Sequence, residues 1–306
     1  TIDGDTNGTI TISNNVDING TAAEIAAAVA LVDTFSGTPT AELSNAHTLA
    51  ELKAINNAIS GTIALNNYAV NLSGSSADVA AALDGTFAST YTGDVSLSDN
   101  HSLGELKTIN NGTDGSITLK NYGVALSGST SDIKQALAGT LASTYTGNVT
   151  LTDSNGTAIA ATDITTIDGD TTGTITVSHN INMTGSAAEI TAAVAVLDTI
   201  SGAPTATLNT AHTLEQLKSV NNAFSGTIAL TDYTVALSGT SSDVAAALAG
   251  TLAAQYTGAV TLTDAHNLQQ LKTINAQTTG TITLADYSVA LSGTSEDVAA
   301  ALDGTF

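Results

Sequence analysis

The sequence predicts an α/β repeat solenoid, in which short strands stack into long sheets and short helices flank the sheets. Two observations favour this fold class: a long stretch returns after 165 residues, and a finer repeat of about 55 residues lies within it. Composition is a third. Ala, Val, Ile and Leu supply nearly all of the 42% hydrophobic content, and aromatic residues make up 4%. Small side chains suit stacked coils, because equivalent residues of neighbouring coils lie close together.

The long repeat is visible by direct comparison. TIDGDTNGTITIS at residue 1 returns as TIDGDTTGTITVS at residue 166, and FSGTPTAELSNAHTL at 35 returns as ISGAPTATLNTAHTL at 200. We therefore expect two blocks of three units each, 1–165 and 166–306, with the second block truncated within its last unit. The finer repeat is marked by the glycine that opens each GTIT-type strand: Gly8, Gly61, Gly115, Gly173, Gly226 and Gly280.

Each unit is predicted to contain two short helices and about three short strands. The first helix is HTLAELKAINN at 47–57, where Leu49, Leu52 and Ile55 recur at helical spacing. Strands follow at GTIAL (61–65) and YAVNLSG (68–74), the second with alternating apolar residues. A second helix, SSADVAAALDG, ends at Gly85, and a third strand is predicted in TGDVSLSD at 92–99. A unit of this size cannot cover both faces of its sheet alone, so the units must stack.

The helix starts have the clearest signals. A Ser, Thr or Asn followed three residues later by Glu, Gln or Asp can bind the free N–H groups of the first turn, which stabilises a short helix by about 1 kcal/mol. Such pairs predict ten helix starts, at Thr21, Thr48, Ser75, Ser102, Ser129, Ser186, Thr213, Thr240, Asn267 and Thr294.

Two further details concern the helices. Lysines recur in what we predict to be the last turn of the first helix, where positive charge complements the helix dipole (Lys53, Lys107, Lys218 and Lys272). The first and fourth units are predicted to have a longer second helix, AAEIAAAVALVDTF at 22–35 and AAEITAAVAVLDTI at 187–200, followed by a proline.

Charge and composition exclude several functions. The six basic residues are all Lys and the net charge is −22, which argues against nucleic acid and anionic membrane as partners. The absence of Cys excludes disulfides and thiolate chemistry. The longest apolar run, 22–35, contains Glu24 and Asp33 and is too short for a membrane span. Neither a nucleophile elbow, a P-loop nor a zinc-protease motif occurs, so we expect no enzyme.

The opening stretch resembles the start of an EF-hand-like calcium loop. Oxygen ligands would come from Asp3, Asp5 and Asn7, with Gly8 close behind. The equivalent positions of most other units are not acidic, and position 12 of the loop is Asn14 rather than Glu. A glycine-terminated turn is therefore favoured over a weak calcium site, and we expect no other cofactor.

Two aromatic residue types recur at fixed positions. Four histidines come just before a helix, at His47, His101, His212 and His266. Local packing is favoured for them over a metal site formed between two coils. Tyrosines recur in Tyr-Thr-Gly, at Tyr91, Tyr145 and Tyr256. Packing between coils is favoured for them over a sugar-binding stripe on the surface. Repetition at a structural position is typical of a scaffold rather than of a catalytic site.

The stretch LSGSSADVAAALDGTFASTYTGDVSLSDNHSLGELKTINN at 72–111 resembles the repeats of giant surface-associated proteins of marine unicellular cyanobacteria, often called RTX-like or structural-toxin proteins. The similarity extends over nearly the whole chain and is closest in units two, three, five and six. It implies a secreted, cell-surface or extracellular-matrix role. The glycine-rich calcium nonapeptides of RTX proteins are not found in this sequence.

The expected function is therefore structural: a repeat protein of an extracellular filament, surface layer or cell-surface stalk. The last residues, 297–306, match 78–87 and would lead into a further strand, which predicts a piece of a longer repeat chain. The partner would be the protein itself, through the ends or sides of the solenoid. The alternative is an adhesin-type module that recognises glycan or another cell.

Overall fold

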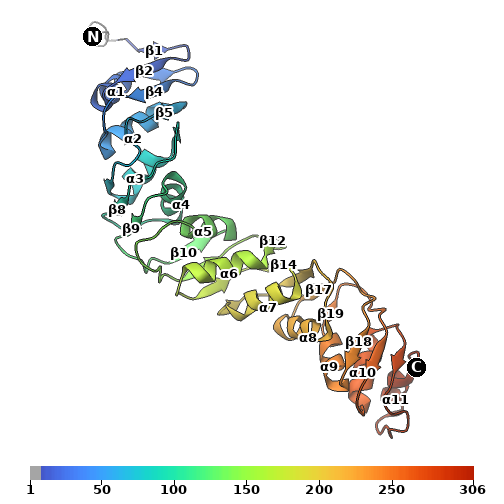
Figure 1. Cartoon of the computed structure of the whole chain (residues 1–306). Coiled ribbons are helices and arrows are strands. Elements are labelled where there is room, and N and C mark those ends of the chain that lie inside the picture. Colours follow the sequence, from blue (N-terminus) through green and yellow to red (C-terminus); the bar gives the residue numbers. More distant parts are fainter. Residues whose placement is uncertain (1–7) are drawn as a thin grey trace. The chain divides into compact units, whose positions relative to one another are not determined.

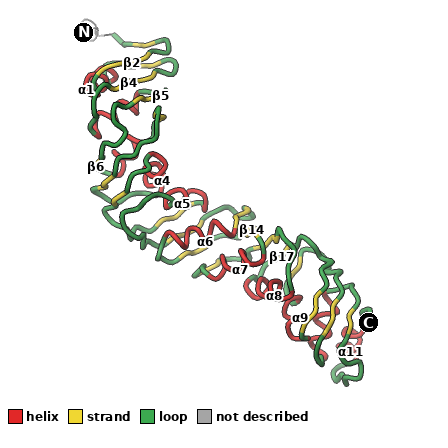
Figure 2. Tube along the Cα trace, in the orientation of Figure 1, coloured by secondary structure: helices red, strands yellow, loops and turns green. Residues whose placement is uncertain are grey.

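The computed structural model describes residues 8–306, and in this range the chain is α/β, with eleven helices and parallel sheets (Figure 1, Figure 2). Two compact units are found. The first contains the residues up to Val149 together with Gly169–Gly173, and the second contains Thr150–Asp168 and Thr174–Phe306. Each is described separately. None of the helices in the described range is long and apolar enough to cross a bilayer.

The helices of the first unit begin at a constant spacing along the chain, and each contacts the next. Short and long helices alternate. They are α1 (Ala22–Val29), α2 (Leu49–Ala58), α3 (Ser76–Leu83), α4 (Leu103–Gly112) and α5 (Thr130–Leu137). Each unit of the sequence repeat thus consists of two coils of equal length, and each coil contains one helix.

The second unit keeps this spacing after the irregular helix α6 (Ala161–Asp170). Successive helices from α7 onward begin at the same interval as those of the first unit, and again each contacts the next. They are α7 (Ala187–Ala195), α8 (Leu214–Ala223), α9 (Ser241–Leu248), α10 (Leu268–Gln277) and α11 (Ser295–Leu302).

The strands of the first unit pair in parallel with strands of the neighbouring coil, as in Asp17↔Thr40, Ala41↔Ile63 and Thr62↔Thr86. The sheet orders are β1-β3, β2-β4-β5-β7 and β6-β8-β9, all open. The strands are β1 (Thr11–Ile12), β2 (Asp17–Gly20), β3 (Thr34–Phe35), β4 (Thr40–Leu43), β5 (Thr62–Ala64), β6 (Leu72–Gly74), β7 (Thr86–Phe87), β8 (Val95–Leu97), β9 (Ile117–Thr118) and β10 (Leu126–Gly128). Strand β11 (Val149–Leu151) begins at the residue where the first unit ends.

The second unit contains the open sheets β12-β14-β16-β17-β19 and β18-β20-β21, and β13 pairs with β15. Its strands are also parallel: Ala206 pairs with Ile228 and Leu237 with Val260. The strands are β12 (Ala158–Ala160), β13 (Ile175–Val177), β14 (Asn182–Gly185), β15 (Thr199–Ile200), β16 (Thr205–Leu208), β17 (Thr227–Ala229), β18 (Leu237–Gly239), β19 (Thr251–Leu252), β20 (Val260–Leu262) and β21 (Ile282–Thr283).

The core lies between helices and strands, and α2 illustrates how it forms. The helix connects β4 to the adjacent parallel strand β5. Its residues Leu52 and Ile55 have no exposed surface, and neither does Ile63 of β5. Removing such side chains from water stabilises the fold by about 1.5–3 kcal/mol each. Helices this short are not stable alone, so this packing holds them in place.

All ten predicted helix starts are confirmed as N-caps. At each, the side chain of the Ser, Thr or Asn accepts a hydrogen bond from the backbone N–H three residues later. Where the third residue is Glu or Gln, its side chain also reaches back to the N-cap backbone and completes a capping box, as Glu51 does with Thr48.

Some predicted details were wrong. A fourth strand, β7 (Thr86–Phe87), follows the short helix and was not predicted. Two residues are too few to show the alternation of apolar and polar residues that indicates a strand. In the predicted second strand only Leu72–Gly74 is extended, since Tyr68 lies in the preceding turn. The longer helices predicted for the first and fourth repeat units of the sequence do not form. Helix α1 ends at Val29 and α7 at Ala195, because Thr34–Phe35 and Thr199–Ile200 pair as strands instead.

Candidate functional site

The candidate calcium ligands Asp3, Asp5 and Asn7 lie outside the described residues. The second copy of the motif, TIDGDTTG at 166–173, is described and is not an ion-binding loop. Its residues up to Asp170 belong to α6, and burial raises the pKa of Asp170, which disfavours a charged ligand there. In this second copy of the motif, the predicted glycine-terminated turn is therefore replaced by the end of helix α6. Within residues 8–306, no group of three or more His, Asp or Glu side chains could hold a metal.

The recurring histidines and tyrosines form pairs in the core. His47 Nε2 lies 3.1 Å from Tyr91 Oη, and the pairs His101–Tyr145 and His212–Tyr256 repeat this at 3.1 and 3.2 Å. Each of these tyrosines is at most 1% exposed. Packing between coils is thus confirmed for the tyrosines, and the sugar-binding stripe predicted as their alternative is wrong because their rings are buried. The local packing predicted for the histidines is wrong for these three, because each bonds a tyrosine 44 residues further along the chain.

The hydrogen bonds define the protonation of these pairs. Tyr91 Oη donates to the carbonyl oxygen of Val70 at 2.6 Å, so it accepts from His47 and the proton of the imidazole is on Nε2. The other nitrogen, Nδ1, is then an acceptor, and it is buried without a partner. Burial lowers the pKa of the histidine, against the opposing field of Glu51. Each pair is therefore a structural contact rather than a metal site or a proton relay.

The lysines do not interact with the dipole of their own helix, contrary to the prediction. Lys53 lies in the middle of α2 and binds Asp78 at the start of α3, the next helix. The other three pairs are Lys107–Asp132, Lys218–Asp243 and Lys272–Asp297. An Asp at this position is too short to reach back and close a capping box, so its carboxylate is available to the lysine. The hydrogen bond from Lys53 lowers the pKa of Asp78.

An asparagine one turn further along makes a second link in each of the four long helices that contain such a lysine, α2, α4, α8 and α10. Asn56 Nδ2 donates to the carbonyl oxygen of Ala81 in α3 at 2.8 Å. A side chain at position 85 would collide with this asparagine. A Cβ atom on Gly85 would lie closer to Asn56 Oδ1 than two non-bonded atoms can approach. Glycine is therefore needed at position 85 because Asn56 approaches the backbone closely there, and not because the backbone adopts a left-handed conformation. The same contact recurs at Asn110–Gly139, Asn221–Gly250 and Asn275–Gly304.

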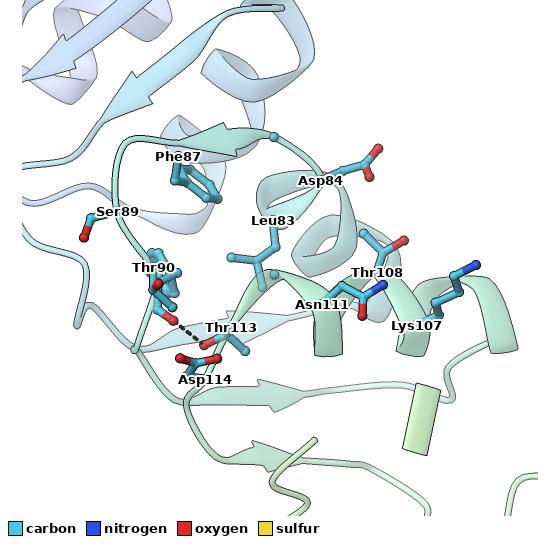
Figure 3. Close-up of a pocket in the computed structure, with 13 residues that line it drawn as sticks. Leu83, Asp84, Phe87, Ser89, Thr90, Lys107, Thr108, Asn111, Thr113 and Asp114 are labelled. Atoms are coloured by element: carbon cyan, nitrogen blue, oxygen red, sulfur yellow. Dashed lines mark hydrogen bonds between the residues drawn. The ribbon is translucent and has the colours of Figure 1, made fainter. Parts of the chain in front are cut away.

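One hollow stands apart from these repeated contacts. It has a volume of about 650 Å³ and opens in the first unit between the end of α3, the segment 84–91 that follows it, and the second half of α4 (Figure 3). In Figure 3, Asp84 and Asp114 come from opposite sides of the hollow, Leu83 lies between them, and the Phe87 ring lies to one side on the segment 84–91. The remaining polar lining comes from Ser89, Thr90, Lys107, Thr108, Asn111 and Thr113.

The framework of the hollow is fixed by backbone and core contacts. Asp114 N donates to the carbonyl oxygen of Tyr91 at 2.9 Å, and Thr113 Oγ1 donates to that oxygen and to Gly93 O (Figure 3). The Phe87 and Tyr91 rings pack 5.9 Å apart. These contacts hold the two sides of the hollow together. Thr113 is buried by them, whereas Asp84, Ser89, Thr90, Asn111 and Asp114 are exposed.

Sequence reasoning did not identify this hollow as a site. It singled out residues that recur, whereas the pair Asp84 and Asp114 does not: the residues at the corresponding positions 165 residues later are Ala249 and Thr279. Comparing aligned units for exposed polar residues that differ would have shown the signal. Comparison of the chain with models of protein families, with curated proteins and with solved structures finds no match in any of the three.

Proposed function

We propose that this chain is a structural repeat protein: a solenoid segment of an extracellular filament, surface layer or cell-surface stalk. The observation that supports the proposal best is the pair of links between a long helix and the next short helix. The Lys–Asp ion pair and the Asn–carbonyl bond occur together four times, at Lys53, Lys107, Lys218 and Lys272 and the asparagines three residues later.

These repeated links support a chain in which each coil is stabilised by its neighbours. The recurring His–Tyr, Lys–Asp and Asn–carbonyl pairs are contacts between coils. Contacts of this kind support a solenoid, because contacts between neighbouring coils extend along an axis. The two blocks expected from the sequence, 1–165 and 166–306, belong to the same proposal as two copies of a three-unit solenoid block.

Extracellular location and self-association are part of the proposal. The acidic surface, with a net charge of −22, and the absence of Cys are compatible with a secreted repeat protein. The resemblance of 72–111 to surface-associated cyanobacterial repeats points to the same location. Self-association would occur through the ends or sides of the solenoid, where coils lack a neighbour.

Light scattering over a range of protein concentrations tests self-association, and negative-stain electron microscopy tests the filament. Growth in mass with concentration, and fibres with a regular axial repeat, are the expected results. A protein that stays monomeric at high concentration would refute self-association. Separate globules joined by flexible tethers in the micrographs would refute the solenoid itself.

An adhesin-type module that binds glycan is the second candidate. The observation that favours it is the polar hollow between α3 and α4, since the repeated contacts of the scaffold do not involve the side chains of Asp84, Asn111 and Asp114 that line it.

A further inference from the structure

The hollow between α3 and α4 contains two carboxylates without a structural task. Elsewhere many aspartates do structural work: Asp78 binds a lysine, Asp99 accepts from the backbone N–H of Ser76, and Asp94 accepts from Ser116 N. No hydrogen bond or ion pair to the side chains of Asp84 and Asp114 is found among residues 8–306. Both line the same hollow, so these carboxylates are available to a ligand.

The corresponding stretch of the second unit, 248–279, has the same framework but a different lining. Gly85, Tyr91 and Thr113 correspond to identical residues there, namely Gly250, Tyr256 and Thr278. Other polar side chains of the hollow are replaced, while Lys107, Thr108 and Thr113 are kept. Asp84 is replaced by Ala249, Thr90 by Gln255, Asn111 by Ala276 and Asp114 by Thr279. The fold therefore does not need these four residues, because the same coil forms without them.

The lining restricts the chemistry of a ligand. Two carboxylates repel anions, and the nearby ammonium of Lys107 already binds Asp132 at 2.5 Å. A volume of about 650 Å³ is far larger than a metal ion requires, and two carboxylates are fewer than a calcium site uses. Carboxylates, the Asn111 amide and threonine hydroxyls are suited to ligand hydroxyl groups, and the Phe87 ring offers an apolar surface.

We propose that the hollow lined by Asp84, Phe87, Thr90, Asn111 and Asp114 binds a neutral saccharide. Sugar hydroxyls donate to the two carboxylates and exchange hydrogen bonds with Asn111 and Thr90. The C–H face of the sugar ring packs near Phe87. The site is independent of the scaffold role, since Asp84, Thr90, Asn111 and Asp114 are not shared by the corresponding coil. The side chains of these four residues make no hydrogen bond or ion pair within residues 8–306.

The test is a ¹H–¹⁵N NMR titration of the whole chain with glucose, galactose, N-acetylglucosamine and cellobiose, each alone. We expect saturable shifts at residues 83–91 and 107–114 with at least one of the four, at an affinity of about millimolar. Glucuronic acid, which carries a carboxylate, should bind at least about ten-fold more weakly than glucose, if glucose binds.

The variant pair Asp84→Ala and Asp114→Thr introduces the residues of the corresponding coil and should reduce the affinity at least about ten-fold with an unchanged circular dichroism spectrum. Asp303→Ala is the matched control: Asp303 belongs to the same LDGTF motif at the end of α11, and its substitution should leave binding unaltered. Shifts outside the two segments, shifts with calcium chloride alone, or no shifts with any of the four sugars would each overturn the proposal.

Discussion

Acidification should destabilise the fold through the buried histidines His47, His101 and His212. Burial lowers the pKa of each below its ordinary value near 6.5. Since the Nδ1 atoms are buried without a partner, a proton there would be a buried charge with no acceptor. Nearby carboxylates, Glu51, Glu105 and Asp232, act in the opposite direction, but burial is the larger effect.

The direction and size of the effect follow from linkage. Below pH 6.5 the unfolded chain binds a proton at each of these histidines while the folded chain does not, so stability falls as the pH falls toward the folded pKa. The loss per pH unit is at most about 1.4 kcal/mol for each histidine, a limit reached only between a strongly lowered folded pKa and pH 6.5. The first unit contains His47 and His101, so its loss is at most about 3 kcal/mol per pH unit, compared with a typical stability of about 5–15 kcal/mol.

Two measurements check this expectation. NMR titration of the imidazole C–H signals gives each histidine's pKa in the folded chain, and urea unfolding at pH 7.5 and pH 5.5 gives the change in stability. This window avoids the aspartates and glutamates whose pKa is lowered in the fold, such as Asp78, because their contribution is lost only at more acidic pH.

Two histidine variants separate the causes. His101→Gln keeps a donor for Tyr145 but cannot titrate, so it should reduce the pH dependence of the first unit by about half. His179→Gln, at an exposed histidine, is the control and should change nothing. If His47, His101 and His212 titrate at or above pH 6.5, or if stability is equal at the two pH values, the reasoning about the unpartnered Nδ1 atoms is refuted.

Three further substitutions test the links between coils. Gly139→Ala should destabilise the fold by about 1–3 kcal/mol, because the new methyl group displaces Asn110 from its bond to the α5 backbone; combining it with Asn110→Ala should recover part of this loss in urea unfolding. Ser102→Ala removes an N-cap and should cost about 1 kcal/mol by the same assay, whereas an unchanged midpoint would contradict the role of the cap. Lys218→Met should shift the urea midpoint less than Ser102→Ala does, because the Lys218–Asp243 pair is partly exposed; a larger shift would show that the ion pairs matter more than their exposure suggests.

The sequence predicted the elements that follow from local chemistry. Helix α2 was predicted from the spacing of Leu49, Leu52 and Ile55 and from the cap at Thr48, and these are local signals. Strand β7 was missed because it is defined by pairing with β5, on the other side of helix α3 in the chain, rather than by its own pattern. The same holds for Lys53, whose partner on the next helix depends on how the coils pack.

The candidate site was less predictable, for a related reason. Recurrence in the sequence identified His47 and Tyr91 correctly as structural residues. It could not show that Asp84 and Asp114 face one hollow, since they are far apart in the chain and belong to different coils. Only the packing of α3 against α4 brings them together.

The alternation of the two helix types determines how such a chain can lengthen or shorten. The lysine of a long helix needs the aspartate of the short helix after it, and the short helix in turn uses Ser76 to bond Glu105 of the following long helix. Losing one coil would place two helices of the same type side by side, with lysines facing no aspartate. Losing or gaining two coils would leave every junction matched. Natural variants of this chain should therefore differ in length by whole pairs of coils rather than by single coils.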